Sequence, residues 1–333
     1  MKISKTMFLK DWLDIWYETY AKPFVKNSTL VSYECYIRRH IKPYIGNIRL
    51  CDLNTITFQQ FFNLQAADGN CRTDGNSTLS PKTLLNLRMM LHEAIADAVK
   101  NQLMSCNYVE YVKMPKQQHV ERRVLTQSEQ ARLIQTLKAS DDPFAFGVFL
   151  CLATGIRVGE LCGLYWSDFT ISESISTVQI QRTLGRLPNL ETGKGTIIHI
   201  SPPKSAASKR SIPLDSCTLQ FLERYQTQQA ELLGMEYTTG NHFLISRIPG
   251  KPVEPKFMQT KFKKFLHAAY IPDANFHALR HTFATRALEC NVDYKTLSTL
   301  LGHANVTVTM NLYQHVLIQQ KQNAICKIAQ YLG

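Results

Sequence analysis

The sequence predicts a mostly α-helical protein of two domains, with a small antiparallel β-sheet in the second domain. Apolar residues recur with helical spacing over most of the chain, and only residues 175–214 show the alternation typical of strands. A basic segment that contains proline and has no apolar period, residues 113–123, separates the two domains. With 333 residues, 44% of them hydrophobic, the chain can bury a core in each domain.

The first domain, residues 1–112, is predicted to be a bundle of helices. The face of its first helix is expected to carry Phe8, Trp12, Ile15 and Trp16. A second helix is expected to be capped by Asn27 or Ser28 and to end near Pro43. A third is expected over residues 57–65. A fourth begins where Ser80 caps a helix whose first residue is proline, a strong start signal.

Basic residues outnumber acidic ones in both domains, which suits an extended polyanion as a partner. The counts are 15 against 10 up to residue 116 and 23 against 16 after it. On the first domain, the candidates for contacts with DNA phosphates are Arg38, Arg39, Lys82 and Arg88. An ordinary solvated face explains any one of these residues equally well.

The linker 113–123 ends in Arg122 and Arg123, and its basic character would let it follow a DNA backbone. A capping box from Thr126 to Glu129 then opens the second domain, residues 124–315. The nearly all-apolar run from residue 143 to 153 predicts a buried helix.

Arg157 follows that buried helix directly, at a junction where an unpaired charge would be costly. Glu160 is spaced to hold it. Two interpretations remain open at this point. The two residues form a structural ion pair, or Arg157 faces a cleft and binds an anion while Glu160 orients it.

Three segments between residues 175 and 214 are predicted to form one three-stranded antiparallel sheet: 176–184, 196–201 and 211–214. Lys204 lies on the turn before the last of them. A lysine at a hairpin tip is usually only solvated, and Lys209 and Arg210 lie close by. Helical pattern resumes at Asp215 and again over residues 256–269.

The stretch from residue 277 to 315 gathers two histidines, an arginine and a phenol, at His277, Arg280, His303 and Tyr313. Such a set could converge on one phosphate, with tyrosine as the nucleophile and no metal. Each residue has an ordinary explanation of its own: a lone tyrosine is usually packed, and His303 could start a helix. His277 and His281 are spaced for a metal, but no HExxH glutamate accompanies them.

Other classes of function find little support in the sequence. It has no GxxxxGK[ST] or GxGxxG phosphate loop, which argues against ATP- or NAD-driven chemistry. Its nine cysteines form no CxxC pair, so reduced thiols in a cytosolic protein are expected. No apolar run approaches 18 residues, and no signal peptide follows Met1.

Four motifs in order resemble the tyrosine recombinases, the family of phage integrases that exchange DNA strands: TGIRVGELCGLYWSD, PPKSAASKRSIPL, HALRHTFAT and LGHANVTVTMNLYQH. The resemblance covers almost the whole chain and is nearest to integrases of conjugative transposons and temperate phages. It implies a C-clamp built from a helical core-binding domain and a mixed α/β catalytic domain. It also implies that the enzyme integrates or excises a mobile element.

The resemblance assigns roles residue by residue. Tyr313 would attack the DNA and form a 3′-phosphotyrosine with a free 5′ hydroxyl. Arg157, Arg280 and His303 would bind the scissile phosphate, and His277 would act in proton transfer. Lys204 would protonate the departing oxygen, and Glu160 would support the first arginine. These roles require no ATP, metal or other cofactor. Lys209 and Arg210 become further candidate DNA contacts.

The resemblance also implies partners and surroundings. The expected partners are double-stranded DNA with core recombination sites, three further copies in a homo-tetramer on two duplexes, and accessory DNA-bending or excision proteins. The tail 316–333 would be a helix that docks on a neighbouring subunit. The expected location is the bacterial cytoplasm, at the nucleoid and not in a membrane. Because the helical domain begins by about Phe8, we expect no additional N-terminal arm-binding domain within the sequence.

Two alternatives stay open. A resolvase or a type IB topoisomerase-like enzyme would use the same cleavage step with different partners. A DNA-binding regulator would keep the fold without the chemistry.

Overall fold

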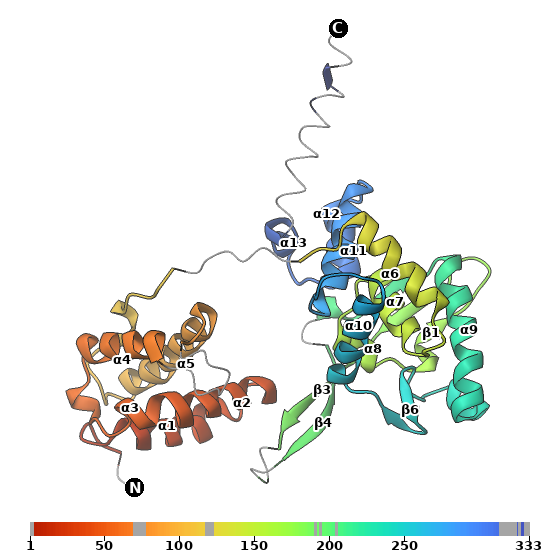
Figure 1. Ribbon diagram of the computed structural model, residues 1–333. Helices are drawn as coiled ribbons and strands as arrows, with labels where there is room; N and C mark the ends of the chain where they lie inside the picture. Colours follow the sequence, from red (N-terminus) through yellow and green to blue (C-terminus); the bar gives the residue numbers. More distant parts are fainter. Residues whose placement is uncertain are drawn as a thin grey trace. The chain divides into compact units, whose positions relative to one another are not determined.

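The computed structural model describes residues 3–68, 78–116, 123–189, 192, 195–203, 206–312, 325 and 328–329. The chain divides into two compact units, residues 1–120 with 187–195, and residues 121–186 with 196–333 (Figure 1). The first unit is helical and the second mixes helices with small antiparallel sheets, as the sequence predicts. The domain limits proposed from the sequence remain predictions. The tail 316–333 lies outside the described residues, apart from residues 325, 328 and 329.

The first unit consists of helices and short helical turns joined by loops (Figure 1). They are α1 (Leu9–Trp16), η1 (Tyr17–Ala21), α2 (Asn27–Cys35), η2 (Tyr36–Ile41), α3 (Lys42–Ile45), η3 (Leu50–Asp52), α4 (Thr55–Asp68), α5 (Pro81–Lys100) and η4 (Tyr108–Tyr111).

Helices α1 and α5 pack together in this unit, and two tryptophans of α1 form hydrogen bonds to α5. Trp12 Nε1 donates to the carbonyl of Ala94 and Trp16 Nε1 to Asp97 Oδ2, both at 2.9 Å. The predicted face of α1 is corrected at one end. Phe8 is the N-cap residue and is 37% exposed, and Leu9 is buried in its place.

The helix starts are predicted correctly in one case and wrongly in another. Ser80 Oγ accepts from the backbone N–H of Thr83 and caps α5, as expected. The N-cap of α2 is Lys26, so neither Asn27 nor Ser28 caps that helix, and no side chain bonds to its free N–H groups. The apolar spacing located the helix, but Lys26, the extended residue directly before it, lies one position earlier than the first polar candidate.

The second unit has more elements (Figure 1). Its helices and helical turns are α6 (Gln127–Ala139), α7 (Ala145–Thr154), α8 (Val158–Cys162), η5 (Trp166–Asp168), η6 (Ala206–Ser208), α9 (Ser216–Leu233), η7 (Met235–Thr238), α10 (Pro255–Ala268), α11 (His277–Glu289), α12 (Tyr294–Leu301) and α13 (Val306–Leu312). Its strands are β1 (Phe169–Thr170), β2 (Thr177–Ile180), β3 (Thr183–Pro188), β4 (Thr196–Ser201), β5 (Arg210–Pro213), β6 (Ser246–Ile248) and β7 (Lys251–Pro252).

Helix α7 is the core of this unit, and α6, α9, α10 and α11 pack around it. Every residue of α7 except Ala153 is buried, which confirms the predicted buried helix. The capping box that opens α6 is also confirmed. Thr126 Oγ1 accepts from the N–H of Glu129, and Glu129 Oε2 accepts from the N–H of Thr126.

The predicted three-stranded sheet is wrong in its membership. The observed sheet has the antiparallel order β1-β2-β5, while β4 pairs with β3 in a separate two-stranded sheet. The run 176–184 therefore divides into two strands. At the division, the side chain of Arg182 turns inward to Asp168 and lies 4.0 Å from the centroid of the Tyr165 ring. Arg182 keeps the inward phase of the alternation that Val178 and Ile180 begin, but it lies between the two strands and belongs to neither.

No helix within the described part of the chain is long and apolar enough to cross a membrane.

Candidate active site

Arg157 is the N-cap residue of α8, at a sharp turn between two buried helices. Helix α7 ends at Gly155, whose φ of 69° lies in the left-handed region that favours glycine. A Cβ at this position would lie 2.5 Å from the ring of Phe283. Glycine thus allows the backbone to turn tightly, and the turn directs Arg157 out of the core.

Glu160 lies between two arginines and holds both. Arg157 Nη1 donates to Glu160 Oε1 at 2.6 Å, and Arg157 N donates to Oε2 at 3.0 Å. On the other side, Arg210 Nη2 donates to Oε2 at 2.9 Å. The Glu160 side chain is 3% exposed, whereas that of Arg157 is 36% exposed. The two interpretations of this pair are therefore compatible, because a buried carboxylate fixes an arginine that still reaches solvent.

The protonation of Glu160 supports that geometry. Burial raises the pKa of its carboxyl, but the hydrogen bond and charge of Arg210, with the charge of Arg157, outweigh burial and lower the pKa below its usual value. Glu160 therefore carries a full negative charge at neutral pH. A charged carboxylate in this position holds both guanidinium planes in fixed orientations.

Arg280 is buried on α11, and it joins the ends of two helices. Its Nη1 donates to the carbonyl of Gly155 at 2.9 Å and its Nη2 to the carbonyl of Leu301 at 2.7 Å. These carbonyls close α7 and α12, so the guanidinium lies where the segments of Arg157 and His303 meet. Only 3% of Arg280 is exposed. Its orientation is therefore set before any ligand arrives.

His277 is the first residue of α11 and is exposed. Its ring meets the ring of His281 edge to face, with 4.7 Å between centroids. His281 is 5% exposed and lies one turn further along the helix. No group of three or more His, Cys, Asp or Glu residues suited to a metal ion occurs among the residues that the structure describes.

His303 follows the left-handed Gly302 that ends α12. Its backbone N–H donates to the carbonyl of Ser298, and its Nδ1 lies 2.7 Å from Thr309 Oγ1. Burial, followed by the positive charges of Arg280, Arg157, Arg210 and His277, lowers the pKa of His303 from 6.5 to about 4. The imidazole is therefore neutral at physiological pH.

A hollow of about 520 Å³ adjoins these residues and is lined by Arg157, His277 and Arg280. The sequence analysis missed three polar side chains in its wall, Gln259, Lys263 and Asn275. Nothing in the sequence pattern distinguished them, because Gln259 and Lys263 lie on α10, which reads as an ordinary amphipathic helix, and Asn275 lies in the segment between α10 and α11. The structure thus brings together two predicted arginines and a predicted histidine on one concave surface.

Lys204 and Tyr313 lie outside the described residues, so their predicted roles stay predictions. Their chain neighbours are described. Ser208, which follows Lys204 on the path to β5, donates from Oγ to the carbonyl of Gly302 at 3.4 Å. The segment after Lys204 is therefore attached to the turn that carries His303.

Arg210 corrects one predicted DNA contact. Its side chain is 3% exposed, and it bonds to Glu160 and, through Nε, to the carbonyl of Leu300 at 2.6 Å. Unlike Arg157 and Arg280, Arg210 does not line the hollow, and its guanidinium is bonded to Glu160 and to backbone carbonyls, so it belongs to the framework of the site. The predicted strand began at residue 211, one position after Arg210, so the sequence pattern gave no side for this arginine to face.

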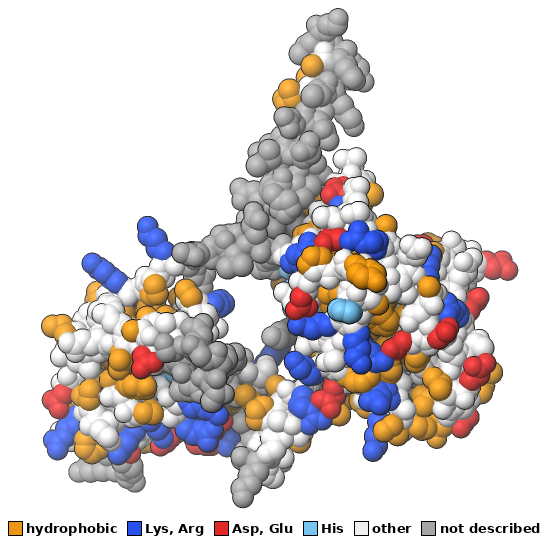
Figure 2. Space-filling view, viewed as in Figure 1, with side chains coloured by type: hydrophobic (Ala, Val, Ile, Leu, Met, Phe, Trp, Pro, Cys, Tyr) orange, Lys and Arg blue, Asp and Glu red, His pale blue; other side chains and the backbone are white. Residues whose placement is uncertain are grey.

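The other predicted DNA contacts differ in their surroundings. Arg38, Arg39, Lys82 and Lys209 are exposed. Figure 2 shows Lys and Arg side chains on the visible face of each unit, among hydrophobic, acidic and other residues. Arg88 Nη2 donates to the carbonyl of Glu110. Arg123 forms an ion pair with Glu129 at 2.6 Å, and Arg122 lies outside the described residues.

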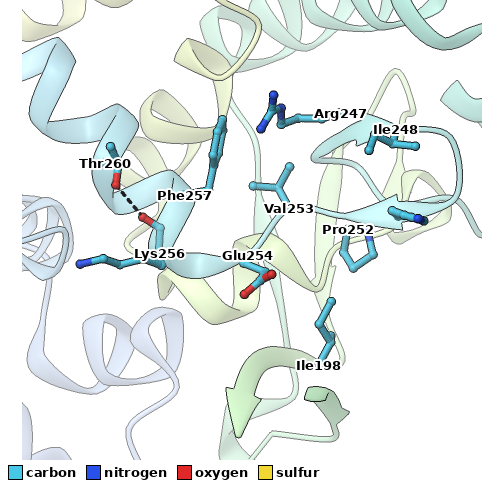
Figure 3. A pocket seen from close by; sticks show the side chains of 10 residues that line it. Ile198, Arg247, Ile248, Pro252, Val253, Glu254, Lys256, Phe257 and Thr260 are labelled. Carbon is cyan, nitrogen blue, oxygen red and sulfur yellow. Dashed lines mark hydrogen bonds between the residues drawn. The ribbon is translucent and has the colours of Figure 1, made fainter. Parts of the chain in front are cut away.

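A second hollow, of about 600 Å³, lies beside β6, β7 and α10 (Figure 3). Val253 and Phe257 line it together with Ile198 of β4, and the guanidinium of Arg247 lies 4.7 Å from the Phe257 ring. None of the predicted catalytic residues lines this hollow.

Comparison with known proteins follows the same division of the chain. Residues 123–320 match the model of the phage integrase family, and residues 8–64 match the N-terminal SAM-like domain of phage integrases. A tyrosine recombinase XerC-like protein of Caldanaerobacter subterraneus is 28% identical over 95% of this chain and 81% of that protein.

Solved structures agree in fold. The Tn1549 transposon integrase bound to transposon right end DNA superposes with a TM-score of 0.78 at 20% identity, over 97% of this chain and 100% of that one. A lambda integrase tetramer bound to a Holliday junction gives a TM-score of 0.64 at 22% identity, over 92% of this chain and 77% of that one.

The fold and the matched relatives together define an enzyme that recombines DNA. Since the family match spans more than half of the sequence, the chain belongs to the phage integrase family. It is a tyrosine-type site-specific DNA recombinase.

Proposed function

We propose that Tyr313 is the nucleophile of this recombinase and that Arg157, Arg280, His303, His277 and Lys204 complete its active site. The observation that supports this most is the convergence of Arg157, Arg280 and His277 on one hollow, with the neutral His303 beside the two arginines. These residues come from segments more than a hundred positions apart in the sequence.

The two arginines and His303 bind the non-bridging oxygens of the scissile phosphate. Negative charge gathers on these oxygens as the nucleophile attacks, so donors fixed in advance stabilise the transition state more than the ground state. Arginine suits this role because its planar group reaches two oxygens and keeps its charge at any physiological pH. Glu160 and the carbonyls of Gly155 and Leu301 hold the two guanidinium groups in place.

Cleavage forms one bond and breaks one. The Tyr313 oxygen attacks phosphorus, its proton is transferred with the help of His277, and the bond from phosphorus to the 5′ oxygen breaks. Lys204 gives its proton to that departing oxygen, a step for which general acid catalysis contributes roughly 10² to 10⁴-fold. The phosphotyrosine conserves the bond energy, so rejoining by a 5′ hydroxyl requires no ATP. Lys209 is exposed and close in sequence, and it is the competitor of Lys204 for this role.

The natural reaction is integration or excision of a mobile element at core sites on double-stranded DNA. A homo-tetramer on two duplexes, with tails 316–333 docked between subunits, supplies the second pair of strands. Support comes from the lambda integrase tetramer of similar fold and from the exposed Ile325 and Ile328. The phosphates along the DNA are contacted by Arg38, Arg39, Lys82, Lys209 and the linker arginines. Accessory DNA-bending proteins assist the reaction, and the enzyme works at the bacterial nucleoid.

A nicked suicide duplex tests the chemistry. After cleavage a short 5′-hydroxyl fragment diffuses away, so a covalent adduct between the protein and the 3′ end of the DNA accumulates. We expect the adduct with the natural chain and none with Tyr313→Phe, whereas Lys209→Ala forms it at a near-normal rate and Lys204→Ala does not. An adduct that persists in Tyr313→Phe would disprove the assignment of the nucleophile.

A resolvase or type IB topoisomerase-like enzyme shares this cleavage step and is distinguished by its products. Exchange between two separate duplexes identifies integration, and relaxation of a single supercoiled plasmid without exchange identifies the alternative. No adduct under any condition would indicate a DNA-binding regulator.

A further inference from the structure

The hydrogen bond between His303 and Thr309 has no role in the chemistry described so far. Nδ1 of His303 and Oγ1 of Thr309 are 2.7 Å apart. Thr309 is completely buried, so water does not compete for its hydroxyl. The residue lies on α13, the short helix that directly precedes Tyr313 in the sequence.

A neutral imidazole carries one N–H, and the partner of one ring nitrogen decides the state of the other. When a hydroxyl donates to Nδ1, the proton of the ring lies on Nε2, which can then donate to a phosphate oxygen. When the hydroxyl accepts from Nδ1, the bare Nε2 repels that oxygen. The choice of tautomer therefore decides whether His303 stabilises or opposes phosphate binding.

The surroundings of His303 make this choice necessary. Cationic groups face the imidazole from three directions: Arg280 and His277 on α11, Arg157 at the start of α8, and Arg210 on β5. Burial of the ring, together with these charges, keeps a second proton from being added, so the histidine cannot donate from both nitrogens. The backbone bond from His303 to Ser298 fixes the base of the side chain but leaves the tautomer undetermined.

We propose that Thr309 is a positioning residue, which donates its hydroxyl proton to His303 Nδ1 and so holds His303 as an Nε2–H donor for the scissile phosphate. The proposal rests on the proposed function, in which His303 binds that phosphate. Helix α13 then has two roles, because it leads to the nucleophile Tyr313 and also fixes the tautomer of His303, which binds the phosphate.

Three variants separate the hydroxyl from the shape of the side chain. Thr309→Val keeps the branched shape and removes the hydroxyl, and Thr309→Ser restores the hydroxyl. Thr307→Val makes the same change at an exposed position of the same helix. On the suicide duplex we expect adduct formation to slow by about 10- to 100-fold in Thr309→Val, by analogy with the partners that orient metal-bound histidines. Thr309→Ser should recover most of the rate, and Thr307→Val should retain it.

A double-mutant cycle excludes a merely structural effect. If Thr309 acts through His303, Thr309→Val has no further effect on the rate in a His303→Ala background. If the valine only disturbs packing, the fold-reductions in the rate of adduct formation from the two substitutions multiply. Multiplying losses, an unaffected rate in Thr309→Val, or a failure of serine to rescue would each overturn the proposal.

Nitrogen NMR of the full chain with ¹⁵N-labelled histidine tests the tautomer without any catalysis. We expect the Nε2–H form for His303 in the natural chain and in Thr309→Ser, and a mixture of tautomers in Thr309→Val. An Nδ1–H form in the natural chain would refute the inference even if every variant folded poorly. Because this measurement needs no DNA, it remains decisive if the proposed chemistry at Tyr313 fails.

Discussion

At the scale of single residues, the site depends on charges that are buried only because they are paired. Glu160 contacts Arg157 and Arg210, and both of its oxygens are used. An isolated carboxylate at this depth would be protonated or would destabilise the fold. The same local field keeps His303 neutral. The residues proposed to bind the phosphate therefore form one electrostatic unit, in which a change of one charge alters the protonation and orientation of the others.

Replacing Glu160 with glutamine should destabilise the second unit by roughly 3 kcal/mol, because the buried Arg210 loses its counter-charge. Chemical unfolding measures this loss, and adduct formation should fall with it as Arg157 loses its support. Asp141→Asn is the matched control, since its pair with Arg224 spans 3.4 Å and the aspartate is 99% exposed. We expect that control to change stability by less than about 1 kcal/mol. Equal effects would show that Glu160 is not the anchor of the site.

The low pKa of His303 predicts a loss of stability in acid. The folded pKa is about 4 and the model-compound value is 6.5, so between these values the unfolded chain binds the proton and the folded chain does not. The contribution of neutral His303 is therefore complete above pH 6.5 and is lost as the pH falls towards 4. In unfolding curves over this range, the natural chain should lose more stability than His303→Gln. Parallel losses would contradict the shift.

At the scale of elements, the site forms where the ends of several helices meet, and no single sequence motif contains it. The carbonyl ends of α7 and α12 meet at Arg280, and the start of α8 carries Arg157. Strand β5 is bound to α12 through Arg210 and Leu300. In the sequence, the apolar run 143–153 located α7, and the strand pattern at 211–214 located β5. The pattern did not show that these ends would meet.

Gly302, at the end of α12, is one of these junctions. Its φ is +66°, and a Cβ would lie 2.9 Å from Arg210 Nη1 and 3.2 Å from the Cα of Ser208. Gly302→Ala should therefore cost more than the roughly 1 kcal/mol of a left-handed alanine and should slow adduct formation by moving His303.

Gly250→Ala is the control for Gly302→Ala. Its φ is +72° and its Cβ would meet nothing within 4 Å, so it should show the backbone cost alone. Thermal unfolding of the two variants compares them. If they lose the same stability, the approach of Arg210 and Ser208 places no constraint on the turn.

At the scale of the whole molecule, a single chain holds a site for one phosphate, whereas strand exchange requires several. The proposed tail contact would supply the link between copies. The described tail residues Ile325 and Ile328 are 65% and 55% exposed, and they are spaced to share one face of a helix. Apolar side chains left in water favour association, which is consistent with a partner surface.

A chain that ends at His315 should still form the covalent adduct on one duplex, but it should not assemble on paired sites or exchange strands. Sedimentation on DNA with two core sites measures the assembly, and product analysis measures the exchange. As a control, Ile325→Ala with Ile328→Ala in the full chain should weaken the assembly without abolishing the adduct. Normal assembly of the shortened chain would end the proposal that the tail links subunits.

The sequence alone determined the helical first unit, the capping boxes and helix starts at Ser80 and Thr126, the buried helix α7 and the candidate set Arg157, Arg280, His277 and His303. The elements follow from local spacing, since periodicity and capping are properties of neighbouring residues, and the candidate set follows from the resemblance of four motifs to the tyrosine recombinases. Only the tertiary structure decided that Arg210 is buried against Glu160, that β4 leaves the main sheet, and that Thr309 reaches His303. Each of these depends on which side of an element faces inward and what lies opposite, and residues distant in the chain decide that together.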